Sequence, residues 1–161
     1  MDYLNRLDVG IDPGNSAGCI TLRSDIKGLV TLEHYEIKKM TLQDLLHLQK
    51  QIIVMARLYD KVSVVMEKIN SFGGPNANAM NKLARNCGEL EFFMVGLRLP
   101  YSEVTPRTWQ KFYNMKKDKK EGDTQWKRRL RGVAEKLYPK ENFTNSKIDS
   151  TLLAHYNYKN Q

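Results

Sequence analysis

The sequence predicts an α/β protein in which a mixed central sheet, beginning with an antiparallel meander, is flanked by helices. Two observations carry this prediction. Three strand-like segments follow one another at the start of the chain, and helical spacing of apolar residues then alternates with short strands. With 161 residues, of which 41% are hydrophobic, the chain is long enough to bury one core. We therefore expect residues 1–161 to form a single domain.

The first part of the chain predicts the meander and one helix. Apolar residues alternate with small or polar ones over residues 7–11, 19–23 and 29–35. The first of these segments runs into Asp12, Pro13 and Gly14, which favour a tight turn. From Thr41 the apolar spacing becomes helical, and Thr41 with Asp44 matches a capping box, so a helix is expected over residues 42–58.

The second part predicts two further strands and three helices. Residues 62–66 are almost all apolar, as in a central strand that is covered on both faces. A helix is expected from about Met80 to Met94, and a short strand over 99–104. Residues 126–137 predict an amphipathic helix, and a last helix follows Asn145 and Ser146, with Asp149 on its apolar stripe.

Composition excludes several classes of protein and favours a polyanionic partner. The longest apolar runs are far shorter than the ~20 residues of a membrane span, and the first residues lack a secretory apolar segment, so we expect a cytoplasmic protein with no membrane partner. Cys19 and Cys87 predict buried thiols. The chain has 26 Lys and Arg against 18 Asp and Glu, a formal charge of +8.

Much of this positive charge is clustered with aromatic residues. A lysine-rich solvated surface is one explanation. The other, which we favour, is nucleic-acid binding, because cations neutralise phosphates and flat rings stack on bases. The cations concerned are Lys116, Lys117, Lys119, Lys120, Lys127, Arg128 and Arg129, interleaved with Phe112, Tyr113 and Trp126.

Three acids stand at positions that suggest a metal site. Asp12 ends the first strand and Glu67 ends the buried strand, so they leave the same sheet edge if these strands are adjacent and parallel. Asp149 on a core-facing stripe must be paired, protonated or metal-bound. Converging carboxylates favour Mg²⁺ or Mn²⁺, and two such ions about 4 Å apart support phosphodiester hydrolysis.

Each acid also has a structural explanation. Asp12 can be the first residue of a turn, and Glu67 can pair with Lys68. Asp149 can complete a capping box that Ser146 opens. The metal site is favoured because all three acids fall where the expected strand and helix order brings them together.

Four segments in register resemble RuvC-type Holliday junction resolvases, most closely the small versions carried by bacteriophages. These are residues 9–14 (VGIDPG), 64–68 (VVMEK), 103–109 (EVTPRTW) and 147–154 (KIDSTLLA). The resemblance implies an RNase H-like fold, a homodimer in the host cytoplasm, and two Mg²⁺-dependent sites that nick symmetrically related strands of four-way and other branched DNA. It makes Asp12, Glu67 and Asp149 three of the family's four catalytic metal ligands, with two ions per site.

The chain departs from the family pattern at the fourth acid. The position three residues before Asp149 is Ser146, with Asn145 beside it. Either of these supplies a neutral oxygen, or Asp8 on the same face of the first strand contributes, or the substitution impairs the enzyme. His155 is a candidate for assisting water activation.

Two more expectations concern DNA and the dimer. The family often has an aromatic residue that stacks on junction bases just after the glutamate; here Phe72 is the candidate, and Lys68 is expected to contact DNA. The helix after Pro75 is the candidate dimer interface, because residues 92, 93, 95 and 97 are apolar and lie outside its main stripe.

Three other functions are compared with the resolvase. A catalytically impaired branched-DNA binding protein of the same fold is supported by the neutral residues 145 and 146. A nuclease of this fold that acts on RNA is the second. Sugar kinases and actin-like ATPases begin similarly, but they need two such domains and roughly twice this length.

Overall fold

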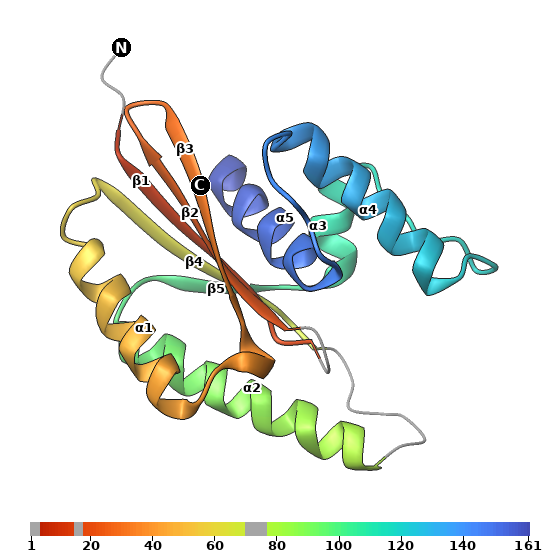
Figure 1. The fold of residues 1–161 in the computed structure, drawn as a ribbon, viewed down its shortest axis with the longest axis horizontal. Coiled ribbons are helices and arrows are strands. Elements are labelled where there is room, and N and C mark those ends of the chain that lie inside the picture. Colours follow the sequence, from red (N-terminus) through yellow and green to blue (C-terminus); the bar gives the residue numbers. More distant parts are fainter. Residues whose placement is uncertain (1–3, 15–17, 70–76) are drawn as a thin grey trace.

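The computed structural model describes residues 4–14, 18–69 and 77–161, and a five-stranded mixed sheet forms its centre (Figure 1). The order of the strands across the sheet is β3-β2-β1-β4-β5. β1 pairs with β2 and β2 with β3 in antiparallel fashion, whereas β1–β4 and β4–β5 are parallel. The strands are β1 (Arg6–Asp12), β2 (Cys19–Ile26), β3 (Leu29–Glu36), β4 (Lys61–Glu67) and β5 (Tyr101–Val104). The predicted meander and the predicted parallel neighbours are confirmed.

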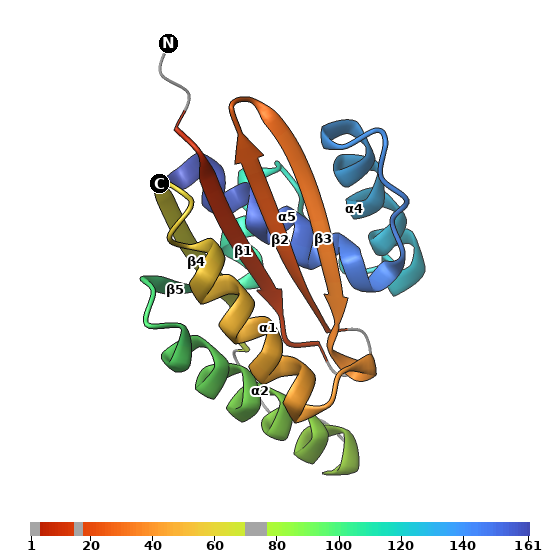
Figure 2. The same ribbon diagram turned by 60° about the vertical axis from the view of Figure 1, so that its left-hand side comes forward.

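Helices cover both faces of the sheet, as Figures 1 and 2 show. On one face lie α1 (Leu42–Met55) and α2 (Ala77–Leu97). On the other face lie α3 (Pro106–Phe112), α4 (Asp123–Leu137) and α5 (Asn145–Asn160). A short 3-10 turn, η1 (Ile37–Lys39), follows β3. The α/β class with helices on both sides of a mixed sheet is therefore confirmed.

The alternation of residues along β1 assigns its acids to one face. Leu7, Val9 and Ile11 belong to the core that packs under α1 and α2. Asp8, Gly10 and Asp12 point the opposite way, toward α5, because successive side chains of a strand alternate. The acids of β1 therefore face the helix that carries Asp149.

Gly10 lets α5 approach the sheet closely. A Cβ atom at this position would lie 2.2 Å from the carbonyl oxygen of Ser150 and 2.4 Å from the amide nitrogen of Ala154. Only a residue without a side chain fits between strand and helix backbone at this distance. Ser150 also makes a 2.7 Å hydrogen bond with the Thr21 hydroxyl of β2. These contacts hold α5 at a defined depth and rotation on the sheet.

α5 is buried on most of its circumference rather than on one stripe. It packs on β1, β2 and β4 on one side and on α3 and α4 on the other. The buried residues include Ile148, Leu152, Leu153 and Ala154. The second core, between the sheet and these three helices, contains Trp109 and Trp126 as its largest members.

Several element boundaries differ from the sequence predictions. α1 ends at Met55, not at residue 58. β2 continues to Ile26, because Lys27 and Gly28, with φ of 53° and 85°, form the tight hairpin turn by themselves. The last strand covers residues 101–104 only.

The short helix α3 was not predicted from the sequence, in which Thr105 and Pro106 were interpreted only as the end of the preceding strand. Pro106 begins α3, and the Thr105 hydroxyl accepts a hydrogen bond from the Thr108 amide. The predicted capping box of α5 is wrong, since Thr144, not Ser146, is the N-cap residue. Asp149 is therefore not explained by helix capping.

Two smaller predictions can be compared with the structure. Cys19 and Cys87 are free and buried, as predicted. Within the described ranges, no helix combines the length and apolar character that crossing a membrane requires.

Candidate active site

Asp12 and Glu67 end two adjacent parallel strands, and Asp149 lies in the second turn of α5 above them. Burial raises the pKa of Asp12 to about 8, and the negative charges of Asp149 and Glu67 add to this shift. Burial also raises the pKa of Glu67 to about 7, with a further contribution from Asp149. The three carboxyl groups that the sequence singled out therefore share one electrostatic environment.

Within the described residues, Asp12 and Glu67 each accept one hydrogen bond from the protein. The Gly14 amide donates to Asp12 Oδ1 at 3.0 Å, and the Asp12 residue is only 7% exposed. The indole Nε1 of Trp109 donates to Glu67 Oε2 at 2.7 Å, which lowers the pKa of Glu67 against the effect of burial. Lys68 pairs with Glu103 at 3.9 Å, so the suggested Glu67–Lys68 pair does not form.

Trp109 was missed as a site residue by sequence reasoning. It is fully buried, and it comes from α3, the helix that was not predicted. The available signal was the turn sequence of Thr105 and Pro106 immediately after β5, which places a helix start beside the end of β4. Through its indole hydrogen bond, Trp109 fixes the orientation of the Glu67 carboxylate.

Asp149 is paired on one oxygen and unpaired on the other. Its Oδ2 forms an ion pair with the ammonium of Lys127 from α4. Its Oδ1 is buried and lacks a hydrogen-bond partner among the described residues. Lys127 was predicted to bind DNA. It instead contacts the acidic group formed by Asp12, Glu67 and Asp149, and serves as its counter-ion.

The donor set suits a hard divalent cation. Carboxylates are preferred ligands of Mg²⁺, and a buried carboxylate oxygen without a partner is costly unless something binds it. Within the described residues, no three His, Cys, Asp or Glu side chains are yet arranged around one metal position. The Lys127 ammonium lies beside Asp149 and balances part of the negative charge there. The residues fit the metal in chemistry and charge.

Ser146 and Asn145 differ in their surroundings. Ser146 is buried one helical turn before Asp149, and its Oγ lies 2.9 Å from the Thr144 hydroxyl. Asn145 is exposed, and its Oδ1 accepts a hydrogen bond from Arg131 Nη2 at 2.9 Å. Of the two neutral candidates, Ser146 is the one on the side of Asp149.

His155 and Asp8 belong to another cluster. His155 Nδ1 lies 2.8 Å from the Tyr138 hydroxyl, and burial lowers the pKa of this histidine to about 4. Asp8 is fully buried and is bound by Arg6 and Arg23. Because both are engaged at the opposite end of α5, the structure does not bring them to the acidic group, and Asp8 cannot replace the fourth acid.

No protein-family model and no curated protein sequence matches the chain. Thermus thermophilus RuvC in complex with a Holliday junction substrate aligns with 96% of this chain and 92% of its own, with a TM-score of 0.55 and 12% identity. A second T. thermophilus RuvC structure aligns with 93% of this chain and 92% of its own, with a TM-score of 0.54 and 11% identity. Yeast mitochondrial Holliday junction resolvase Ydc2 aligns more loosely, over 92% and 75%, with a TM-score of 0.40 and 15% identity.

The chain has a RuvC-like fold of the RNase H-like class. At 11–12% identity this likeness concerns the fold alone. It agrees with the fold that the four sequence segments implied.

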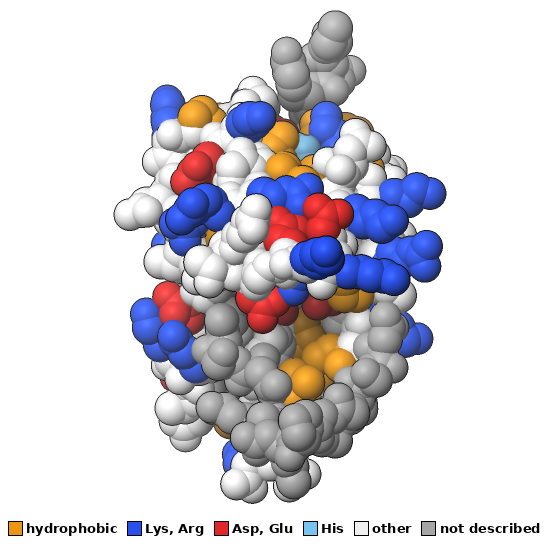
Figure 3. Space-filling model, turned by 90° about the vertical axis from the view of Figure 1, so that its right-hand side faces the viewer, with side chains coloured by type: hydrophobic (Ala, Val, Ile, Leu, Met, Phe, Trp, Pro, Cys, Tyr) orange, Lys and Arg blue, Asp and Glu red, His pale blue; other side chains and the backbone are white. Residues whose placement is uncertain are grey.

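The predicted DNA-binding cations gather on the α4 side of the molecule. Figure 3 shows Lys and Arg side chains on this face, around a small surface patch of Asp and Glu side chains. Some are engaged: Lys117 pairs with Asp123, and Arg129 pairs with Glu121 at 2.8 Å. The remaining ones are exposed and available to solvent, namely Lys116, Lys119, Lys120 and Arg128. Phe72, the predicted stacking residue, lies outside the described residues.

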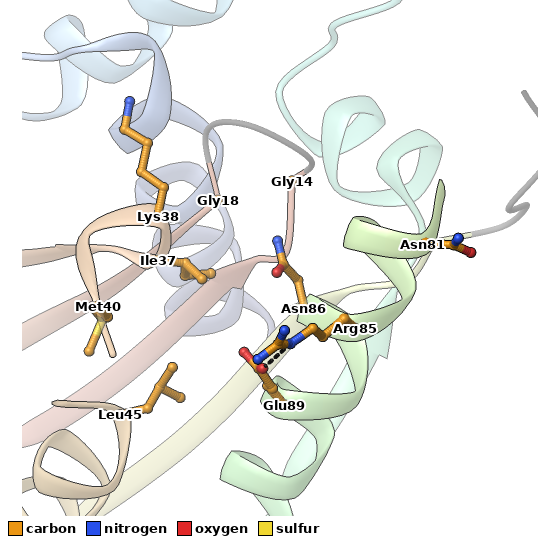
Figure 4. A pocket seen from close by; sticks show the side chains of 10 residues that line it. All are labelled: Gly14, Gly18, Ile37, Lys38, Met40, Leu45, Asn81, Arg85, Asn86 and Glu89. Atoms are coloured by element: carbon orange, nitrogen blue, oxygen red, sulfur yellow. Dashed lines mark hydrogen bonds and ion pairs between the residues drawn. The ribbon is translucent and has the colours of Figure 1, made fainter. Parts of the chain in front are cut away.

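A cleft of about 530 Å³ lies between Gly14, the turn η1 and the helices α1 and α2 (Figure 4). Gly14, whose amide holds Asp12, forms part of its wall together with the neighbouring Gly18. Lys38 and Arg85 line it, but Arg85 is paired with Glu89 at 2.8 Å. The cleft therefore lies on the side of α1 and α2, whereas the carboxylate of Asp12 faces α5.

Proposed function

We propose that the protein is a Holliday junction resolvase, a metal-dependent, structure-selective endodeoxyribonuclease that introduces symmetric nicks into four-way and other branched DNA. One observation carries the proposal. Burial raises the pKa of Asp12 on β1 and of Glu67 on β4, and the negative charge of Asp149 on α5 adds to both shifts, on a RuvC-like fold. Uncompensated buried acids are costly, and such groups mark sites that bind a cation.

Asp12, Glu67 and Asp149 would hold Mg²⁺, or Mn²⁺ in its place, as two ions per site. Bound metal supplies a more acidic water and stabilises charge on the leaving oxygen of the phosphodiester. The protein groups set the position of these ligands: the Gly14 amide orients Asp12, and the Trp109 indole orients Glu67. Lys127 balances the charge of Asp149 through their ion pair.

The fourth ligand position is neutral in this proposal. Ser146 offers a hydroxyl where the family has an acid, so one negative charge fewer faces the ions. The second ion should accordingly bind more weakly than the first. Asn145, held by Arg131, is the less favoured neutral donor.

The proposed enzyme acts as a homodimer through α2. Phe92 and Val95 are 64% and 63% exposed on this helix, which supports an apolar contact there. The prediction was wrong for Phe93 and Leu97, which are buried in the core under α1 and α2. A two-fold axis through α2 would present two active sites to a two-fold symmetric junction.

The cations of the α4 side, together with Lys68, would contact the arms of the junction. The motifs also support a place in the bacteriophage branch of the family, with action in the host cytoplasm during recombination and phage DNA processing. These assignments rest on the sequence resemblance.

A synthetic four-way junction tests the proposed activity. With Mg²⁺, the wild-type protein should nick opposing strands symmetrically and leave 5′ phosphates, and EDTA should abolish the nicks. Glu67→Gln should reduce the rate by about 1,000-fold or more, whereas the exposed Glu135→Gln, with the same change of charge, should leave it unchanged. Equal rates for the two variants would overturn the proposal.

An impaired branched-DNA binding protein is the second candidate. It is favoured by the neutral Ser146 and by the ion pair of Lys127 with Asp149. Ser146→Asp separates the two functions by restoring the fourth acid. If the wild-type chain binds junctions without nicking and Ser146→Asp nicks them, the chain is the impaired form.

A further inference from the structure

A polar recess lies beside the acidic group, between the start of α4 and the start of α5. Its volume is about 310 Å³, and it is lined by Asp123, Thr124, Lys127, Arg128, Arg131 and Asn145. Lys127 also contacts Asp149, so the recess and the acidic group share one residue. A ligand in the recess would therefore lie directly next to the proposed reaction centre.

The charges around the recess favour an anion. Three of its lining residues are cations, and its one acid, Asp123, is already paired with Lys117. Lys127 is paired with Asp149, so among the described residues Arg128 and Arg131 are the lining cations without an ion pair. Such a recess attracts a negatively charged group from solution.

Arg131 is incompletely satisfied in the free protein. Its Nη2 donates to Asn145 Oδ1 at 2.9 Å, which holds the guanidinium at the edge of the recess. Its Nε is buried and has no hydrogen-bond partner within the described part of the chain. Leaving a buried donor unpaired costs free energy, and a phosphate oxygen is an acceptor that the planar guanidinium fork suits well.

We propose that this recess binds a backbone phosphodiester of a nucleic-acid strand, with Arg131 and Arg128 as charged donors and the Thr124 hydroxyl as a neutral one. The assignment to the cleaved strand, next to the scissile phosphate, rests on the proposed function. Arg129 lies outside this site, because it pairs with Glu121 and stacks over Trp126 at 5.4 Å. The sequence cluster of basic residues thus divides into members with different roles.

The side-chain Nε–Hε resonances of Arg131 and Arg128 test binding without any catalysis. Thymidylyl-(3′,5′)-thymidine, which carries a single phosphodiester, should shift both resonances during a titration in EDTA. Arg131→Gln, followed at Arg128, should weaken the apparent affinity about tenfold. Arg131→Lys keeps the charge but loses the fork, and it should also weaken binding.

The exposed Lys136→Gln is the matched control, because it removes one positive charge from the same helix outside the recess. It should change the affinity less than twofold. Backbone amide spectra establish that each variant is folded. An equal loss in Lys136→Gln and Arg131→Gln, or unshifted arginine resonances, would overturn the proposal. A shift with inorganic phosphate but not with the dinucleotide would also overturn it in favour of a free-phosphate site.

Junction binding in EDTA tests the site on the larger ligand. Arg131→Gln should lower the slope of log affinity against log salt by about 0.9, the loss expected for one phosphate contact. An unchanged slope would count against a contact with the junction backbone. Failure of the proposed function is distinct: the junction would then remain un-nicked in Mg²⁺ while the dinucleotide still shifts Arg131.

Discussion

β1 carries two buried aspartates on its α5 side, and their surroundings are opposite in charge. Asp8 accepts hydrogen bonds from Arg6 at 2.8 Å and from Ser63 at 2.9 Å, and it pairs with Arg23 at 3.5 Å. Asp12, four residues further on, lies near the carboxylates of Asp149 and Glu67 instead. Burial raises the pKa of both, but arginines oppose the shift at Asp8, whereas carboxylates increase it at Asp12.

This difference indicates that Asp8 stabilises the fold, whereas Asp12 is available to bind a ligand. The Asp8 cluster continues through Ser63 to Asn157, whose Nδ2 donates to Ser63 Oγ at 2.8 Å. Arg6 Nη2 also donates to the Asn157 carbonyl at 3.1 Å, so this cluster ties the end of α5 to the sheet. At the Asp12 end, the described side chains supply a single ammonium, that of Lys127, for three carboxyl groups.

The largest loss of stability is expected at the end of β1 where arginines neutralise Asp8. Asp8→Ala leaves the buried guanidinium groups of Arg6 and Arg23 without their carboxylate, and it should lower the free energy of unfolding by about 3–5 kcal/mol. Urea unfolding at pH 7 measures the loss. The exposed Asp118→Asn is the control and should stay within about 0.5 kcal/mol. A loss below about 1 kcal/mol would contradict a structural role for Asp8.

The next largest effect is expected at Gly10, which lies between Asp8 and Asp12 and contacts the backbone of α5. Gly10→Ala places a methyl group against the α5 backbone, and it should cost about 3 kcal/mol and displace Asp149 from Asp12. Gly132→Ala is the matched control, since a Cβ atom there has open space within α4 and should stabilise by about 0.5–1 kcal/mol. Equal stability of the two variants would show that α5 is not held as closely as Gly10 indicates.

Asp12→Asn sharpens the comparison through pH. The pKa of Asp12 is about 8 in the folded chain and 3.8 in the reference state, so the folded state binds an extra proton between these values. Stability from this group therefore falls as pH rises through this window. Asp12→Asn removes that loss, so it should stabilise the metal-free protein by about 1 kcal/mol, more at pH 9 than at pH 5. A pH-independent difference would contradict the assignment.

Trp109→Phe should have the smallest effect. It removes the hydrogen bond that lowers the pKa of Glu67, so that pKa should rise further above about 7. If nicking requires the Glu67 carboxylate, the acid side of the pH–rate profile should move upward by up to about one pH unit. The rate at pH 9 should approach that of the wild type. A uniform loss at every pH would instead indicate damage to the core.

Local patterns were sufficient for the strands and for the acids of the candidate site. The alternation in β1 and the apolar run of β4 predicted two strands, and the helix between them favoured their parallel pairing. Asp12 and Glu67 stand at the ends of these strands as expected. Asp149 was identified by its place on a buried stripe, and the structure confirms that α5 is buried around it. Sequence periodicity is informative at these positions because each residue's environment repeats along a regular element.

The partners of those acids could not be predicted from local patterns. Trp109 reaches Glu67 across 42 residues of sequence, and Lys127 reaches Asp149 across 22. The basic stripe of α4 predicted a solvated or DNA-binding surface for Lys127, yet one of its cations turns toward the acidic group. Which side chain meets which carboxylate depends on how deeply α5 settles on β1 and how α3 and α4 pack over it. That geometry is a property of the assembled core, since it follows from contacts between elements and not from the order of residues within one.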